Sequence, residues 1–526
     1  MSPDCDILVI GGGINGCGMA RDLAGRGWRV TLCEKDDLAA HTSSASTKLI
    51  HGGLRYLEHY EFGLVRKALR EREVLLRSAP HIIRPLRLVM PHEPAMRPAW
   101  MIRTGLFLYD HLARRELLPA SRGVRLRSHP AGAALQSKYR RGFVYSDGWV
   151  DDARLVVLNA IDARERGATI LTRTSVTRAV REAGGWSVSL RGEDGRTRGL
   201  RARAIVNAAG PWAAQVLADV VAPLAGQRKP VRRLRLVKGS HIVVPRLFTH
   251  DFAYLFQNSD KRITFAIPYE EAFTLIGTTD VEIDGGGLEG VRADDTEIAY
   301  LCAQANAYFD RKITPADVVW SYSGVRPLLD DEDDDPSAVT RDYLLERDTD
   351  GAPLLSVWGG KITTFRKLAE DGANAMEEML GAPHRAWTEA APLAGGDLGA
   401  GAVPGAGKDP GRDQGRDRDK RSGTLQEQFA RFEARLLGLT PWLPRPVAQR
   451  FARNYGSRVW RLLDGATKLA DMGAEVAPGL FERELAYLRQ EEWARTDDDV
   501  LWRRSKLGLT YTAGARARVR EWMRAG

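Results

Sequence analysis

The chain has 526 residues, of which 44% are hydrophobic and 28% charged; this is typical of a soluble globular protein of two or three domains. Lys and Arg exceed Asp and Glu by 77 to 68, a surplus that suits an anionic substrate or surface but also an ordinary basic exterior. Cys5, Cys17, Cys33 and Cys302 have neither C-x-x-C nor metal-ligand spacing, so we expect reduced core thiols and no metal site.

Residues 6–34 have the pattern of a β–α–β unit: an apolar run, a glycine turn, a helix-like stretch and a second apolar run. Gly11, Gly13 and Gly16 follow the G-x-G-x-x-G spacing, which gives a tight turn, a close approach to a pyrophosphate and close helix–strand packing. Glu34 ends the second run, where a carboxylate would bind a ribose hydroxyl. The stretch predicts dinucleotide binding but does not distinguish FAD from NAD.

Residues 41–58 form a loop rich in hydroxyl side chains, beside a Gly52–Gly53 pair. The hydroxyl residues are Thr42, Ser43, Ser44, Ser46 and Thr47. Two interpretations fit them equally: donors to a pyrophosphate or flavin, or a loop that caps a helix starting near Tyr60. His51 precedes the glycine pair and is a candidate for proton transfer, because the ordinary pKa of histidine lies near neutrality.

A helix is predicted over residues 97–118, where aromatic side chains such as Trp100 and Phe107 alternate with arginines such as Arg103 and Arg114. Such a helix suits a membrane interface. A half-buried amphipathic helix of the protein body also fits, and the pattern alone favours this second interpretation.

Short strands are predicted from residue 165 to 210, the last of which ends in small residues at 207–210. Gly210 would let the chain pass close to a nucleotide. Residues 231–330 contain alternating apolar and polar residues, which predict an antiparallel sheet that covers the site.

Cationic side chains follow in two places. Arg326 and Arg341 flank an acidic run, Asp330–Asp335; they could clamp a phosphate or be ordinary surface arginines, and their spacing favours neither. Gly360 and Lys361 lie where a strand gives way to a helix, and backbone N–H groups with a lysine can stabilise negative charge there.

The composition changes after residue 394. Residues 395–424 are rich in glycine, proline and balanced charge, so we expect a flexible linker. Residues 425–526 carry helical patterns, with Thr496 as a predicted N-cap, and show no residues that indicate chemistry.

Several sequence blocks resemble the aerobic, FAD-dependent glycerol-3-phosphate dehydrogenases of bacteria. They are SSASTKLIHGGLRYLEHYEFGLV (43–65), RPAWMIRTGLFLYDHL (97–112), YSDGWVDDARLV (145–156), KGSHIVVP (238–245), IGTTDVE (276–282), YSGVRPL (322–328), TRDY (340–343), GGKITTFRKLAE (359–370) and WRRSKLG (502–508). The resemblance covers nearly the whole chain except residues 395–424, and the EF-hand extension of the mitochondrial relatives is lacking.

The resemblance implies a multidomain α/β (α+β) fold. A Rossmann-like FAD-binding domain would span residues 1–394, with an antiparallel-sheet substrate domain interleaved at roughly 80–145 and 225–340. An all-helical cap domain would follow the linker. The implied reaction is oxidation of sn-glycerol 3-phosphate to dihydroxyacetone phosphate by hydride transfer from C2 to flavin N5, with electrons passed to a membrane quinone.

The resemblance, joined to the residue analysis, also gives the expected site. The catalytic residues are His51 and Arg326; the substrate-binding residues are Arg55, Tyr56, Arg341 and Lys361; the FAD-binding residues are Gly11, Gly13, Gly16, Glu34, Thr42, Ser43, Ser44, Lys48, Gly210, Gly360 and Thr363. His51 would accept the C2 hydroxyl proton, and Arg326 could instead hold the developing alkoxide.

Polar residues interrupt the most apolar stretch, 204–226, so we predict no membrane span. Because a quinone stays in the bilayer, we expect a peripheral protein on the cytoplasmic face of the inner membrane. The resemblance also allows a homodimer. Two other activities stay open: an oxygen-using glycerophosphate oxidase, and an amine or amino-acid oxidase of the same flavoprotein superfamily. Nucleic-acid binding has no basic tail or known module to support it.

Overall fold

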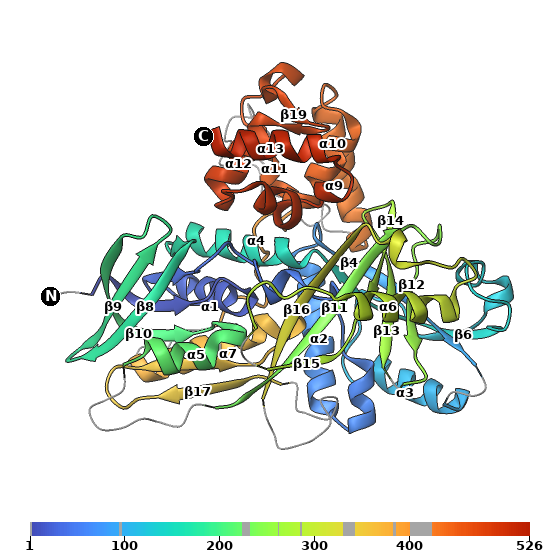
Figure 1. Cartoon of the computed structure of the whole chain (residues 1–526), viewed down its shortest axis with the longest axis horizontal. Coiled ribbons are helices and arrows are strands. Elements are labelled where there is room, and N and C mark those ends of the chain that lie inside the picture. Colours follow the sequence, from blue (N-terminus) through green and yellow to red (C-terminus); the bar gives the residue numbers. More distant parts are fainter. Residues whose placement is uncertain are drawn as a thin grey trace.

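The computed structural model describes residues 3–93, 97–222, 232–260, 262–284, 287–329, 342–381, 386–399 and 423–525. Two β-sheets and their helices form the larger part of the molecule, and residues 423–525 form a mainly helical unit at the top of Figure 1. The fold therefore confirms the predicted α/β architecture with a C-terminal helical domain.

The first sheet contains the predicted β–α–β unit. Its order is β17-β18-β10-β1-β2-β7, with β9 and β8 added beside β10, and β1 is parallel to both neighbours. The strands are β1 (Cys5–Ile10), β2 (Val30–Cys33), β7 (Thr169–Leu171), β8 (Thr174–Glu182), β9 (Gly185–Gly192), β10 (Thr197–Asn207), β17 (Leu344–Asp348) and β18 (Leu354–Trp358). Its strands β2 and β18 are buried along their whole length, as expected of a sheet that helices cover.

Three helices pack together on this sheet: α1 (Ile14–Gly25), α4 (Asp152–Glu165) and α7 (Phe365–Leu380). Gly18 lets α1 approach α7, since a Cβ there would come 2.9 Å from the Phe365 ring. The buried Arg21 Nε donates to Asp162 Oδ2 at 2.5 Å and ties α1 to α4. The helix that starts at the glycine turn is thus held on both sides.

The second sheet has the order β15-β11-β14-β13-β12-β4-β6-β3, with β16 paired to β11 and β5 to β6. Its strands are β3 (Leu49–Ile50), β4 (Ile83–His92), β5 (Arg122–Arg125), β6 (Arg141–Val150), β11 (Leu234–Pro245), β12 (Ala253–Gln257), β13 (Ile263–Tyr269), β14 (Phe273–Gly277), β15 (Val281–Ile283) and β16 (Trp320–Leu329). The strands from residue 234 to 329 pair antiparallel, as predicted. Helix α6 (Asp295–Tyr308) packs on β11, β13 and β14.

Helix α2 (Phe62–Ser78) and helix α3 (Ala99–His111) lie beside the second sheet (Figure 1). The predicted helix over 97–118 is too long by several residues, because the chain turns after His111. The carboxylate of Glu73 accepts the backbone N–H groups of Glu116 and Leu117, which a continuing helix would have bonded internally.

The C-terminal unit has its own apolar core. It contains α9 (Leu425–Leu439), α10 (Arg445–Tyr455), α11 (Val459–Leu462), α12 (Glu482–Glu492), α13 (Ala513–Ala525), the hairpin strands β19 (Glu475–Ala477) and β20 (Leu480–Phe481), and the π-helical turn η11 (Asp499–Arg504). Thr496 caps the last of these turns, as predicted, by accepting the Asp499 N–H at 3.2 Å. The hairpin was not predicted.

The expected linker falls partly on residues that the structure describes. The Gly395 carbonyl accepts the N–H of Ser457, in the C-terminal unit, at 3.0 Å, and a Cβ at Gly396 would lie 2.0 Å from the Ser78 carbonyl oxygen. Residues 400–422 lie outside the described residues. Among the described residues, no helix has the length and hydrophobicity needed to cross a membrane.

Candidate active site

A large cavity of about 680 Å³ runs between the two sheets. The carboxyl ends of β1, β2 and β10 form one wall, where open parallel sheets bind ligands. Strands β11, β13 and β16 of the second sheet form the opposite wall. The cavity therefore joins the predicted nucleotide unit to the predicted covering sheet.

The glycine motif has the geometry that its spacing predicts. Gly11 has φ +111°, and a Cβ there would lie 2.6 Å from the Ala208 carbonyl oxygen. Gly13 lines the cavity and is the N-cap of α1. Gly16 lies behind the wall, where a Cβ would come 1.9 Å from the Gly11 oxygen. The first-turn N–H groups of α1 have no intrahelical acceptor, so this end favours an anion.

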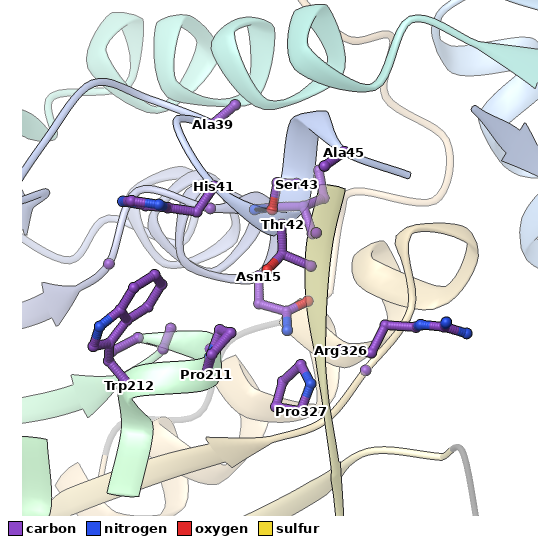
Figure 2. Close-up of a pocket in the computed structure, with 18 of the residues that line it drawn as sticks. Asn15, Ala39, His41, Thr42, Ser43, Ala45, Pro211, Trp212, Arg326 and Pro327 are labelled. Carbon is purple, nitrogen blue, oxygen red and sulfur yellow. Dashed lines mark hydrogen bonds between the residues drawn. The ribbon is translucent and has the colours of Figure 1, made fainter. Parts of the chain in front are cut away.

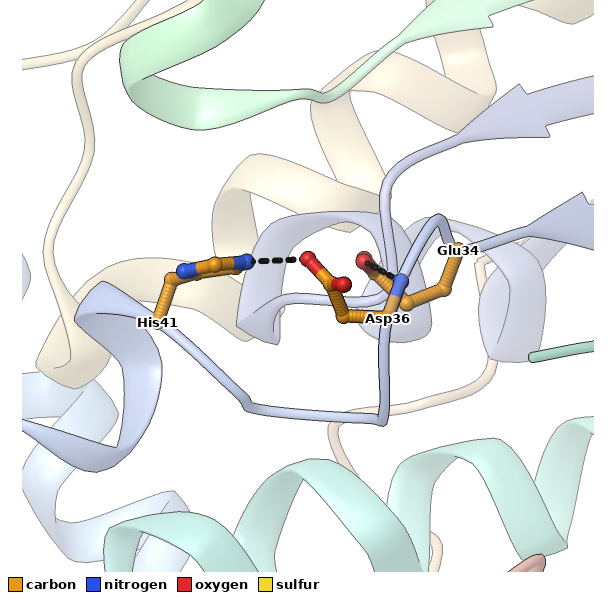
Figure 3. Close-up of side chains that lie close together, drawn as sticks. All are labelled: Glu34, Asp36 and His41. Carbon is orange, nitrogen blue, oxygen red and sulfur yellow. Dashed lines mark hydrogen bonds and ion pairs between the residues drawn. The ribbon is translucent and has the colours of Figure 1, made fainter. Parts of the chain in front are cut away.

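Glu34 lies where β2 ends, and its oxygens are held by the backbone (Figure 3). Oε2 accepts the Gly12 N–H at 2.6 Å and Oε1 accepts the Asp36 N–H at 2.9 Å. Burial raises the pKa of Glu34 despite these two bonds. Beside it, His41 pairs with Asp36 at 2.7 Å, and its ring packs on Trp212 with centroids 4.6 Å apart. Both rings lie on the same side of the cavity in Figure 2.

The hydroxyl loop forms part of the wall. Thr42 Oγ1 donates to the Val325 carbonyl at 2.8 Å, and Ser43 Oγ accepts the Ile14 N–H at 2.9 Å (Figure 2). None of the five hydroxyl residues caps the helix that follows, so the capping interpretation is wrong. The lining residues among them are Thr42, Ser43, Ser46 and Thr47.

Ser44 and Lys48 do not line the cavity. Lys48 is fully buried, and its ammonium donates to Asp152 Oδ1 at 2.6 Å and to the Ser44 carbonyl at 3.1 Å. The Lys48 side chain therefore holds the loop in place from the protein interior. This geometry does not favour the predicted direct contact between Lys48 and a cofactor. Gly210, Gly360 and Thr363 do line the cavity.

At the other end of the cavity, three predicted residues converge. Lys361 Nζ lies 3.7 Å from the centroid of the Tyr56 ring, and both residues line the cavity with His51. The backbone N–H of His51 donates to Thr363 Oγ1 at 3.2 Å. Segments more than 300 residues apart in the chain thus meet at this point.

Two buried side chains fix the turn after His51. The Gly52 N–H donates to the hydroxyl of Tyr109, on α3, at 2.7 Å. That hydroxyl donates to Asp147 Oδ1, also at 2.7 Å. Arg72 donates to the same carboxylate oxygen. The buried face of α3 therefore positions the turn that follows His51.

The predicted arginines have different placements. Arg326 lines the cavity, but its guanidinium is paired with Asp280 and donates to the Thr279 carbonyl at 3.1 Å. Arg55 is half-buried in the short helix that contains Tyr56 and does not line the cavity. Arg341, together with the acidic run 330–335, lies outside the described residues.

His241 on β11 was missed from the sequence. It lines the cavity, stacks on Tyr322 with centroids 4.9 Å apart, and shares a 3.0 Å hydrogen bond with Thr47. Its Nδ1 has no hydrogen-bond partner among the described residues. Burial, with nearby Lys48 and Arg326, lowers the pKa of His241 well below its ordinary value. The sequence signal that could have identified His241 is a histidine in the middle of an apolar strand pattern.

Residues 6–366 match the family described as FAD dependent oxidoreductase, and residues 386–525 match the C-terminal domain of alpha-glycerophosphate oxidase. The chain belongs to the FAD-dependent oxidoreductase family. Its expected cofactor is therefore FAD rather than NAD. The second match covers the C-terminal helical unit.

Curated relatives extend over nearly the whole chain. A glycerol-3-phosphate dehydrogenase of Pseudomonas aeruginosa is 51% identical, covering 99% of this chain and 95% of the relative. A D-erythritol 1-phosphate dehydrogenase of Brucella abortus is 50% identical (98% and 97%), and the aerobic glycerol-3-phosphate dehydrogenase of Escherichia coli is 47% identical (98% and 97%). These matches confirm the resemblance inferred from the sequence blocks.

A solved structure agrees with this family assignment. The glycerol-3-phosphate dehydrogenase from Bacillus halodurans complexed with FAD has a TM-score of 0.69 and 26% identity, and the match covers 99% of this chain and 94% of that chain. Glycine oxidase from Geobacillus kaustophilus, with 18% identity and a TM-score of 0.52, shares the fold alone.

The cavity fits FAD on its own chemistry. The glycine cradle leaves space that a Cβ would fill, and a Cβ at Gly13 would come within 3.0 Å of Ser43 Oγ. Asn15 Oδ1 is buried on the cavity wall and has no partner among the described residues. Glu34 would hold a ribose hydroxyl, and the α1 N-terminus would face the pyrophosphate.

Proposed function

We propose that the protein oxidises sn-glycerol 3-phosphate to dihydroxyacetone phosphate and passes the electrons to a membrane quinone. The observation that carries the proposal is one cavity that joins the glycine cradle of α1 to a cationic end with Lys361 and Arg326. A phosphorylated substrate bound at that end would place its carbinol beside the flavin. The glycerol-3-phosphate dehydrogenases among the relatives support this substrate.

Lys361 is the proposed phosphate ligand. Its ammonium nitrogen is buried, and a dianionic phosphate strengthens such contacts where water is excluded. Arg326 is partly neutralised by Asp280, so we assign it to the C2 oxygen, where negative charge develops during oxidation. Tyr56 beside Lys361, and Arg55 and Arg341, remain predicted substrate ligands.

FAD, when bound, supplies the acceptor for the C2 hydride. The hydroxyl proton needs a separate acceptor, and the proposed group is His51, with His241 as the second candidate. Burial lowers the pKa of His241, so its imidazole is uncharged at neutral pH but is a weak base, which leaves it behind His51 as a candidate. Replacing each histidine by asparagine and comparing the rate of anaerobic flavin bleaching would identify the acceptor.

The substrate assignment is tested with the purified, FAD-loaded protein under anaerobic conditions. Glycerol 3-phosphate should bleach the flavin absorbance, and unphosphorylated glycerol at the same concentration should bleach it far more slowly. Equal bleaching by the two compounds would exclude a phosphate-binding end. Stoichiometric hydrogen peroxide after admission of oxygen would instead identify an oxygen-using oxidase.

A second substrate deserves the same measurement, because the D-erythritol 1-phosphate dehydrogenase is 50% identical to this chain. Both compounds are polyol phosphates and need the same cationic end. The ratio of kcat/KM for D-erythritol 1-phosphate and glycerol 3-phosphate decides between them. A ratio in favour of the four-carbon compound would overturn the proposed substrate but not the phosphate site.

The proposed membrane contact is the exposed face of α3 with the start of α2. Tyr60, Trp100 and Phe107 are 80%, 68% and 54% exposed, although they are large apolar side chains. Arg114 follows α3 by three residues and its side chain is 87% exposed. The region lies away from the C-terminal domain in Figure 1. Shallow insertion of aromatic side chains, with about 1 kcal/mol per basic residue toward anionic lipid, would hold a peripheral protein there.

The membrane contact is tested by Trp100→Asp with Phe107→Asp. Both side chains point to solvent, so activity with a soluble dye should persist while sedimentation with anionic vesicles and quinone reduction decrease. Arg115→Glu is a poorer choice because Arg115 pairs with Asp110 at 2.8 Å. Unchanged sedimentation would assign the contact to another surface.

A further inference from the structure

The segment Asp499–Lys506 of the C-terminal domain is hydrogen-bonded to the loop that begins at Glu34. Arg503 Nε donates to Asp37 Oδ2 at 2.6 Å, and Arg504 Nη2 donates to Asp37 Oδ1 at 2.8 Å. A second nitrogen of Arg504 also reaches this carboxylate. Asp37 is 2% exposed and Arg504 fully buried, so the contact is sealed from solvent.

Asp37 is the hidden part of a loop whose other residues face the cofactor cavity. Glu34, Lys35, Ala39 and His41 all line the cavity. The loop is also fixed to the glycine turn, because the Ala39 N–H donates to the Gly12 carbonyl at 3.2 Å. A shift of Asp37 would therefore move side chains on the cavity wall.

The same segment holds the neighbouring wall through Asp499. Asp499 pairs with Arg173 at 2.8 Å and also with Arg503. The Arg173 N–H donates to the Asp36 carbonyl at 2.8 Å, and the Thr174 N–H donates to the Glu34 carbonyl at 2.7 Å. Thr174 and the next two residues line the cavity. Two segments that face one part of the cavity are thus tied to one turn of the C-terminal domain.

A third contact reaches the opposite sheet. Trp502 stacks on Trp320 at the start of β16, with centroids 4.6 Å apart and planes 20° apart. Trp320 lies against Tyr322, which in turn stacks on His241. The segment therefore connects the nucleotide loop with the strand that carries Arg326.

We propose that Asp499–Lys506 is a cofactor-positioning segment, through which the C-terminal domain sets the affinity for FAD by holding Asp37. The domain has no residue on the cavity wall among those described, so its effect is indirect. This inference depends on FAD binding and not on the identity of the substrate. Its failure would leave the proposed reaction untouched.

The test compares Asp37→Asn and Arg503→Met with Glu165→Gln as a matched control. Arg458 Nη1 donates to Glu165 Oε1 at 2.5 Å, so this pair also joins the two domains. Neither Glu165 nor Arg458 lines the cavity. FAD dissociation is followed by the fluorescence of released flavin, and the melting temperature of each apoprotein is measured alongside. Arg503→Lys keeps a positive charge near Asp37 and should restore part of the affinity.

We expect the FAD Kd to rise roughly tenfold or more in Asp37→Asn and Arg503→Met and to stay at the wild-type value in Glu165→Gln. Excess FAD should restore kcat in both variants. A wild-type Kd with a lowered apoprotein melting temperature would show that the contact only docks the domain and would overturn the proposal. An equal rise in the control would overturn it as well. Arg503 is partly exposed, so its variant decides the question if Asp37→Asn does not fold.

Discussion

Replacement of Lys361 by methionine tests the substrate end of the cavity most directly. Methionine keeps an unbranched apolar stem against the Tyr56 ring, which lies 3.7 Å from the lysine nitrogen, and removes only the charge. A charge-assisted hydrogen bond contributes about 1.5–3 kcal/mol. Because the Lys361 nitrogen is buried, we expect a loss near the upper end of this range.

The range of 1.5–3 kcal/mol corresponds to roughly a tenfold to 150-fold lower kcat/KM for glycerol 3-phosphate, and we expect a value toward 150-fold. The contact with the phosphate is the same in the ground and transition states, so KM should rise while kcat changes little. FAD content should be unchanged. Anaerobic stopped-flow measurement of flavin bleaching at several substrate concentrations separates apparent affinity from the limiting rate.

Two comparisons make this result specific. Lys367→Met is the matched control, since Lys367 lies six residues further along the chain on α7, pairs with Glu370 at 2.6 Å and does not line the cavity. Unphosphorylated glycerol is the second comparison, because its slow oxidation should be the same in wild type and Lys361→Met. Equal losses for glycerol and its phosphate would refute the assignment of Lys361 to the phosphate.

Three further predictions concern the cofactor, the turn after His51 and acid stability. Gly13→Val should abolish FAD retention, seen in the absorbance of the purified protein, because its Cβ alone would lie 3.0 Å from a neighbouring hydroxyl; full retention would contradict the cradle. Tyr109→Phe leaves the Gly52 N–H without its acceptor, so kcat should decrease while KM changes little; an unchanged kcat would mean that the turn is held otherwise. Burial and the nearby Arg154 lower the pKa of His81 to about 3, so unfolding takes up a proton below pH 6.5 and stability decreases as the pH falls toward 3. At pH 5, His81→Leu should remove about 2 kcal/mol of this loss in the free energy of unfolding. Melting curves at pH 7 and pH 5 measure it, and an identical pH dependence in the variant and the wild type would refute the prediction.

The sequence by itself determined the features that depend on local spacing. The β–α–β unit follows from residues 6–34, because the glycine spacing and the apolar runs are set within one stretch of chain. The antiparallel strands after residue 231 follow from their alternation, which has the period of a half-buried strand. The family and the FAD cofactor followed from short sequence blocks that resemble those of known dehydrogenases.

Only the tertiary structure decided how the side chains of the site are used. Lys48 and Arg326 both read as cationic ligands, yet Asp152 holds the first inside the wall and Asp280 neutralises part of the second. Neither partner is near in the sequence, so no local pattern indicated it. His241 was missed for the same reason, since its role depends on the strand that places it opposite the loop at Thr47.

The point where α3 ends and the proposed role of the C-terminal domain also depend on contacts between segments that are far apart in the sequence. Helix α3 ends early because Glu73, on another helix, takes backbone N–H groups beyond it. Asp37 and Arg504 are 467 residues apart, and each alone resembles a solvated surface charge. Folding buries them together, where an ionised group is retained only with its partner, and this pairing joins the C-terminal domain, none of whose described residues lines the cavity, to the loop after Glu34.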